Sequence, residues 1–131
     1  MLDLTRLFGR DQNTMELSAG EIIFREGDEC SEMYVVLDGQ VDIIIGEKIV
    51  ETVDPGGLFG EMALLGPAPR SATAVARFDA TLVAVDNRGF LLKIQQTPYF
   101  AIQVMGVLAD RLRRMPPAPD MPDYVETGSE R

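Results

Sequence analysis

The chain has 131 residues, of which 46% are hydrophobic, and a formal net charge of −9 at pH 7. This negative charge opposes contact with nucleic acid or with an anionic membrane surface. The chain has no histidine and a single cysteine, Cys30. This excludes cupin-type metal centres, haem and iron–sulfur sensors, and Ser–His or Cys–His nucleophiles. No apolar run approaches the ~20 residues of a membrane span, no internal disulfide is possible, and the N-terminus lacks a secretory signal. We therefore expect one domain in the cytoplasm.

The first part of the chain predicts a short helix followed by strands. Residues 3–10 place Leu4, Leu7 and Phe8 on one helical face. From Met15 onward, short apolar segments alternate with turn residues, which is typical of an all-β sandwich or barrel. We predict strands at residues 15–17, 21–24, 32–38, 40–45, 48–53, 58–59, 72–77 and 81–86, with hairpin turns at Asp38–Gly39 and Gly46–Glu47. Eight such strands fit a jelly roll.

The segment LFGEMALLGPAPRSATA, residues 58–74, carries the chemistry. Gly60 allows the backbone to approach a ligand, and Glu61 opens about one helical turn whose free N–H groups can hold an anion. Arg70 brings a planar guanidinium suited to bidentate phosphate contact, and Ser71 adds a hydroxyl. These groups suit a small anion attached to a sugar, with Arg70 on the phosphate and Glu61 on a hydroxyl.

Two helices are predicted after the last strand. Asn87 can cap a short helix over residues 88–95, and Thr97 with Pro98 can open a longer helix that runs to about Met115. The long helix carries two apolar rows, one with Phe100, Val104 and Val107, the other with Ala101, Met105, Leu108, Leu112 and Met115. One row should pack on the barrel, and the other could contact a second subunit or close over a ligand. Arg111, Arg113 and Arg114 are interpreted as a solvated helix end that suits the helix dipole.

The order of residues from Phe59 to Ala72 matches a known pattern, F-G-E-(L/M)-A-L followed by a variable loop and P-R-(S/A/T)-A. It resembles the phosphate-binding cassette of cyclic nucleotide-binding domains, and the resemblance covers roughly residues 17–115. Gly57 departs from it, because the family often has aspartate there. The resemblance implies an eight-stranded β jelly roll with a short N-terminal helix and C-terminal hinge and lid helices. Residues 1–115 would form this domain, and 116–131 a disordered tail rich in proline and acid.

The resemblance also implies a site for a 3′,5′-cyclic nucleotide. Arg70 would pair with the cyclic phosphate, supported by Ser71 and the amides of Met62 and Ala63, and Glu61 would accept from the ribose 2′-hydroxyl. The expected ligand-binding residues are Phe59, Gly60, Glu61, Met62, Ala63, Arg70, Ser71 and Ala72. Serine rather than threonine at position 71 favours cAMP over cGMP. Candidates to cover the base are Tyr99, Phe100, Gln103 and the region of Arg111.

Several alternatives stay open at this stage. Glu61 and Arg70 could form an ion pair on a turn, with no ligand, although an exposed pair contributes little. The chain could also be a protein-interaction module that has lost its ligand. No matched catalytic groups and no metal cluster are evident in the sequence, so we expect a binding protein without metal or cofactor rather than an enzyme. Its partner would be a second copy, bound through helix 98–115, or an unidentified effector protein.

Overall fold

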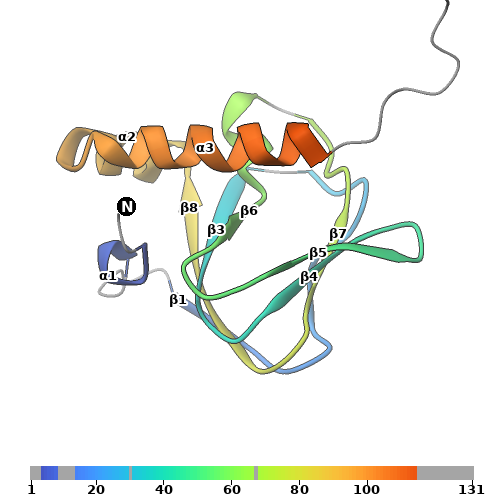
Figure 1. The fold of residues 1–131 in the computed structure, drawn as a ribbon. Coiled ribbons are helices and arrows are strands. Elements are labelled where there is room, and N and C mark those ends of the chain that lie inside the picture. The colour runs from blue at the N-terminus through green and yellow to red at the C-terminus, as the bar shows by residue number, and fades with distance from the viewer. Residues whose placement is uncertain (1–3, 9–13, 30, 67, 115–131) are drawn as a thin grey trace, which may run out of the picture.

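The computed structural model describes residues 4–8, 14–29, 31–66 and 68–114. Two four-stranded antiparallel sheets, ordered β1-β8-β3-β6 and β2-β7-β4-β5, face each other as a jelly roll (Figure 1). The strands are β1 (Thr14–Leu17), β2 (Ile22–Phe24), β3 (Glu32–Asp38), β4 (Val41–Ile45), β5 (Lys48–Val53), β6 (Leu58–Phe59), β7 (Thr73–Ala76) and β8 (Ala80–Asp86). All eight predicted strands are present, with bounds that differ by at most one residue. The helices are α1 (Leu4–Phe8), the 3-10 helix η1 (Glu61–Leu65), α2 (Asn87–Gln96) and α3 (Tyr99–Arg114). Cys30 and the predicted tail lie outside the described residues.

One of the two predicted hairpins is wrong. The turn at Gly46 does join a paired hairpin, because Ile45 lies opposite Lys48. The turn at Gly39 instead connects the two sheets, since β3 pairs with β8 and β6 whereas β4 pairs with β5 and β7. A Cβ on Gly39 would lie 2.3 Å from the carbonyl oxygen of Asp79, so the chain crosses between sheets where no larger residue fits.

Strand β3 explains how one short chain forms two hydrophobic clusters. Successive side chains of a strand point to opposite faces of the sheet. Tyr34 and Val36 lie in the cluster between the two sheets, whereas Met33 and Val35 lie in a second cluster beneath the helices. The sheet that contains β3 is therefore apolar on both faces, which is why the helices must cover it.

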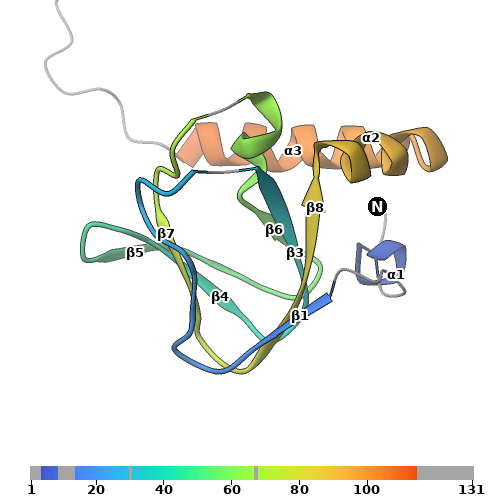
Figure 2. The same cartoon turned by 180° about the vertical axis from the view of Figure 1, so that it is seen from behind.

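The helices lie together over the sheet that contains β3 and β8. Figures 1 and 2 show α3 running across one end of the barrel, with η1 beside its C-terminal half and α1 near α2. The cap of α2 is Asp86, whose side chain accepts from the amide of Gly89 at 2.7 Å, and not Asn87 as predicted. No helix in the described ranges is both long enough and apolar enough to cross a membrane.

One apolar row of α3 is expected to pack on the barrel, and the structure shows that it is the row with Phe100 and Val104. Phe100 and Val104 are buried, and the Phe100 ring lies 5.5 Å from that of Phe8 and 5.6 Å from that of Phe90. Met105 and Leu112, from the second row, are exposed. Helix α3 is thus part of the core at its N-terminal end.

Candidate functional site

The predicted cassette is a tight turn that depends on one glycine. Gly60 precedes η1 with φ of 75° and ψ of 15°, in the left-handed region where a glycine avoids the steric cost of a Cβ. A Cβ there would lie 2.8 Å from Nη1 of Arg70. The turn closes through the amide of Ala63, which donates to the carbonyl of Gly60 at 3.2 Å. The backbone and Arg70 therefore come together only because position 60 has no side chain.

Arg70 is a buried cation that is held by neutral groups. Only 8% of the residue is exposed. Its Nη1 donates to the carbonyl of Gly60 at 3.1 Å, and its Nη2 donates to the carbonyl of Glu32 at 2.6 Å. The guanidinium lies over the ring of Phe24, 4.0 Å from its centroid, and 5.7 Å from the centroid of Tyr34. Among the described residues no carboxylate pairs with Arg70, and its Nε is buried without a hydrogen-bond partner.

The backbone and the opposite strand fix this arginine in place. The amide of Arg70 donates to the carbonyl of Asp28 at 2.8 Å, and the amide of Gly27 donates back to the carbonyl of Arg70 at 2.8 Å. Phe24 lies opposite Ala74 across the β2–β7 pair, so a small side chain faces a large one. Burial, followed by the charge of Glu32, raises the pKa of the Tyr34 phenol beside the guanidinium, so this phenol is neutral at pH 7. Among the described residues, the Arg70 guanidinium thus contacts aromatic faces and carbonyls, and no carboxylate lies within ion-pair distance of it.

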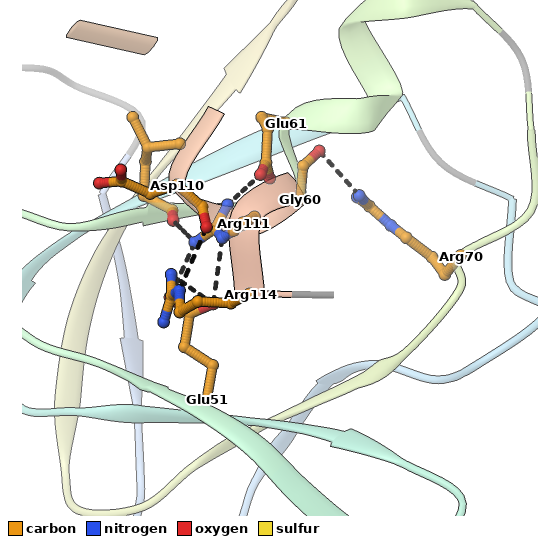
Figure 3. A network of polar contacts seen from close by, with 8 residues as sticks. Glu51, Gly60, Glu61, Arg70, Asp110, Arg111 and Arg114 are labelled. Atoms are coloured by element: carbon orange, nitrogen blue, oxygen red, sulfur yellow. Dashed lines mark hydrogen bonds and ion pairs between the residues drawn. The ribbon is translucent and has the colours of Figure 1, made fainter. Parts of the chain in front are cut away.

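Glu61 is buried as well, and it forms an ion pair with Arg111, a contact that the sequence did not predict. Only 5% of Glu61 is exposed, and its Oε1 accepts a hydrogen bond from Nη1 of Arg111 on α3. Figure 3 shows Glu61 turned toward Arg111 while Arg70 reaches Gly60 from the other side. The alternative in which Glu61 and Arg70 simply pair on a turn is therefore wrong for this structure. The interpretation of Arg111 as a solvated helix end is wrong too.

Arg111 joins three parts of the fold. Its Nε and Nη2 donate to the two carboxylate oxygens of Glu51 on β5, at 3.0 Å and 3.1 Å, and Nη2 also donates to the carbonyl of Leu58 at 2.6 Å. Burial alone would lower the pKa of Arg111, but the hydrogen bond to Glu51 and the charge of Glu61 outweigh it and raise the pKa. Arg111 is therefore charged at neutral pH, and it links the barrel, the cassette and α3.

The remaining predicted residues lie in different surroundings. Phe59 is fully buried, with its ring stacked on Tyr34 at 5.3 Å, and Ala72 is buried. Met62 and Ser71 are exposed. Phe100 is buried, with its ring beside those of Phe8 and Phe90, so in this structure it is not placed to cover a base.

Sequence reasoning missed Glu51 and Phe24 as parts of this site. Glu51 lies 60 positions before Arg111, and no local pattern connects them. Phe24 had one signal, the small residues Ala72, Ala74 and Ala76, all of which are buried and leave room for a large ring. The jelly roll thus brings a buried arginine and a buried carboxylate to the turn at Gly60, beneath a C-terminal helix.

Comparison with known proteins defines the family. The family model described as "Cyclic nucleotide-binding domain" matches residues 14–97. The cAMP-dependent protein kinase regulatory subunit of Eremothecium gossypii is 43% identical over 74 residues, which cover 56% of this chain and 16% of that protein. The cyclic AMP receptor protein of Thermus thermophilus is 38% identical over 99 residues, 72% of this chain and 46% of the other. The chain belongs to the cyclic nucleotide-binding domain family.

Solved structures agree with this assignment. A structure described as "A cyclic-GMP-dependent signalling pathway regulates bacterial phytopathogenesis" superposes with a TM-score of 0.75 at 26% identity, covering 88% of this chain and 96% of that chain. The catabolite activator protein of Thermus thermophilus gives a TM-score of 0.73 at 33% identity, with 85% of this chain and 54% of that chain covered. The chain spans less than half the length of the curated relatives named above.

Proposed function

We propose that this domain binds a 3′,5′-cyclic nucleotide, with the cyclic phosphate on Arg70. The observation that carries the proposal is the state of the Arg70 guanidinium: it is buried, has no anionic partner in the described ranges, and has an Nε without a hydrogen bond. A buried charge is costly unless it is paired. A phosphate would supply both the opposite charge and acceptors that match the planar guanidinium.

The sugar and the rest of the phosphate would use the neighbouring cassette residues. Glu61 would accept a hydrogen bond from the ribose 2′-hydroxyl, and the exposed Ser71 and the amide of Met62 would donate to phosphate oxygens. The amide of Ala63 is used inside the turn, donating to Gly60 at 3.2 Å, so we assign Ala63 a role in the shape of the turn. Phe59, Gly60 and Ala72 would shape the floor of the site.

We expect cAMP to bind more tightly than cGMP. The serine at position 71 supports this preference, as do the names of the kinase subunit and of the receptor protein. The structure connected with a cyclic-GMP-dependent pathway requires that both nucleotides be tested. We assign the base to barrel residues and to the exposed Tyr99 or its neighbours on α3.

The domain would act as a cytoplasmic sensor without catalysis. Nucleotide binding would be signalled by a change in the contacts of helix α3. Glu61 accepts a hydrogen bond from Arg111, so a ribose hydroxyl that binds Glu61 would weaken this contact between the cassette and α3. A ligand shifts such an equilibrium only by its different affinity for the two arrangements. A partner, either a second copy at helix 98–115 or another protein, would read this change.

A second candidate is a protein-interaction module that binds no nucleotide. The observation in its favour is that Arg111 already occupies the carboxylate expected to hold the ribose. In that case the domain would present a permanently docked α3 to its partner.

Thermal denaturation with added nucleotide distinguishes the two functions. A ligand at 100 times its Kd stabilises the folded state by about 2.7 kcal/mol, if it binds only that state. We expect cAMP to raise the Tm of the wild type and of Arg113→Ala, whose side chain is exposed, but not that of Arg70→Ala. Absence of a shift with either nucleotide at millimolar concentration would favour the interaction module.

Glu61→Ala gives a separate check of the ribose contact. This variant should bind cAMP more weakly, but it should bind 2′-deoxy-cAMP about as well as the wild type does, because that analogue has no hydroxyl to donate. If Glu61→Ala kept the full preference for cAMP over 2′-deoxy-cAMP, Glu61 would not hold the ribose.

A further inference from the structure

Arg111 lies between two carboxylates, and it holds one of them more completely than the other. Glu51 receives two nearly parallel hydrogen bonds, from Nε at 3.0 Å and from Nη2 at 3.1 Å. Glu61 receives one, from Nη1. A bidentate pair of an arginine with a carboxylate fixes orientation as well as charge. Arg114, one turn further along α3, also approaches Glu51, at 3.9 Å.

A nucleotide would compete for only one of these carboxylates. If Glu61 turns to a ribose hydroxyl, the bond from Nη1 weakens, while the bonds to Glu51 and to the carbonyl of Leu58 are untouched. The two carboxylates belong to different elements, β5 and the cassette, so one can change its partner without the other.

We propose that Glu51 is a positioning residue of the nucleotide site, which retains Arg111, and with it helix α3, when Glu61 turns to the ribose. This inference rests on the proposed function. Glu51 contacts no nucleotide itself: it acts through Arg111. It lowers the cost of freeing Glu61, because the guanidinium keeps a complete anionic partner.

The surroundings of Arg111 allow this transfer. A cavity of about 210 Å³ lies between β5, the following turn and α3, lined in part by Glu51, Val107, Asp110, Arg111 and Arg114. The side chains of Arg111 and Glu51 are each 22% exposed, so water can reach the pair. The guanidinium can therefore shift toward Glu51 without entering a closed core.

The inference predicts an effect on selectivity rather than on affinity alone. Without the carboxylate of Glu51, Glu61 would be the main anionic partner of Arg111. A ribose hydroxyl would then have to displace Arg111 from Glu61. The analogue 2′-deoxy-cAMP has no 2′-hydroxyl, so it does not compete with Arg111 for Glu61. Removal of one negative charge would also strengthen the attraction for phosphate, but equally for both nucleotides, so this effect cancels in the ratio of the two Kd values.

Isothermal titration of the wild type and three variants with cAMP and 2′-deoxy-cAMP tests the proposal. Glu51→Gln removes the charge and one acceptor, and Glu47→Gln makes the same change on an exposed residue of the same hairpin. We expect the preference for cAMP to fall about three- to tenfold in Glu51→Gln, the range for a partly exposed charged hydrogen bond, and to be unchanged in Glu47→Gln. Glu51→Asp keeps the charge, spoils the bidentate geometry, and should give a smaller fall.

Hydrogen exchange over residues 108–114 gives an independent readout. In the wild type, cAMP should speed exchange there only slightly, because Arg111 loses its bond to Glu61 but keeps its bonds to Glu51 and Leu58. In Glu51→Gln, cAMP should speed exchange clearly more, and 2′-deoxy-cAMP should not speed it in either protein. An unchanged preference in Glu51→Gln, or in Glu51→Asp if the first variant does not fold, would overturn the role of Glu51 while leaving nucleotide binding intact. If the wild type bound neither nucleotide, both this inference and the proposed function would be wrong.

Discussion

Substitution of Arg70 by alanine should affect folding and binding by different amounts. In the free protein the guanidinium donates to two neutral carbonyls, at 3.1 Å and 2.6 Å, and lies over the Phe24 ring. A hydrogen bond from a charged group contributes about 1.5–3 kcal/mol, but the variant also relieves the cost of burying an unpaired cation. We expect these effects to leave a net loss of about 1–2 kcal/mol in the free energy of unfolding.

The loss in binding should be larger, because the phosphate is charged. Removal of one partner from a buried charge pair costs about 2–5 kcal/mol, which corresponds to about a 30- to 4,000-fold weaker affinity for cAMP. Arg70→Lys keeps the charge but not the planar guanidinium, and it should fall between the wild type and Arg70→Ala.

Two measurements on the same protein separate these effects. Urea unfolding without nucleotide gives the change in stability, and isothermal titration at a temperature where the variant is folded gives the change in affinity. Wild-type affinity in a folded Arg70→Ala protein would refute the assignment of the phosphate to Arg70. A loss of stability as large as the loss of binding energy would mean that Arg70 serves mainly to hold the cassette to β3.

Three further substitutions test separate parts of the structure. Gly60→Ala should lower the free energy of unfolding by about 1–2 kcal/mol and also weaken cAMP binding, because its Cβ would meet Arg70. Gly46→Ala is the control: φ is positive there too, at 63°, but no other atom lies within 4 Å of the added Cβ. It should lower stability in urea unfolding and leave the cAMP affinity in isothermal titration unchanged. Phe100→Leu should lose about 1–2 kcal/mol in urea unfolding but keep the wild-type cAMP affinity, which would fail if Phe100 covered the base. Burial raises the pKa of Tyr34, so the neutral phenol stabilises the fold fully below pH 10, and this contribution is lost as the pH rises from there. As the pH is raised above 10, the free energy of unfolding of Tyr34→Phe should therefore fall less than that of the wild type, and an equal fall would contradict this.

The sequence predicted the strands well because local rules decide them. Alternating apolar residues and glycine turns place each strand, and β3 has the predicted bounds of residues 32–38. The cassette could likewise be predicted from a local pattern, because Gly60, Glu61 and Arg70 lie within eleven residues of one another. Gly60 has the unusual backbone conformation that the sequence indicated, with φ of 75°, and its role in the approach to a ligand stays a prediction.

The rest of the site depends on contacts between distant segments, which local patterns cannot show. Arginines at the end of a helix favour its dipole in any soluble protein, so nothing near Arg111 indicated that Glu51 and Glu61 lie beside it. In the same way, an Asp–Gly pair suits a hairpin or a crossing between sheets. The strand pairing shows which applies: β3 pairs with β8 and not with β4, so the chain passes from one sheet to the other at Gly39. The cap at Asp86 rather than Asn87 is a difference of one position, within the usual uncertainty of helix ends.

Isothermal titration of the wild-type domain with cAMP and with cGMP tests nucleotide binding most directly, with Arg70→Ala as the matched control. We predict saturable binding of one nucleotide per chain, tighter for cAMP than for cGMP, and a loss of about 30-fold or more for cAMP in Arg70→Ala. No binding of either nucleotide to the folded wild type, or equal binding by the wild type and the variant, would contradict a phosphate site at Arg70.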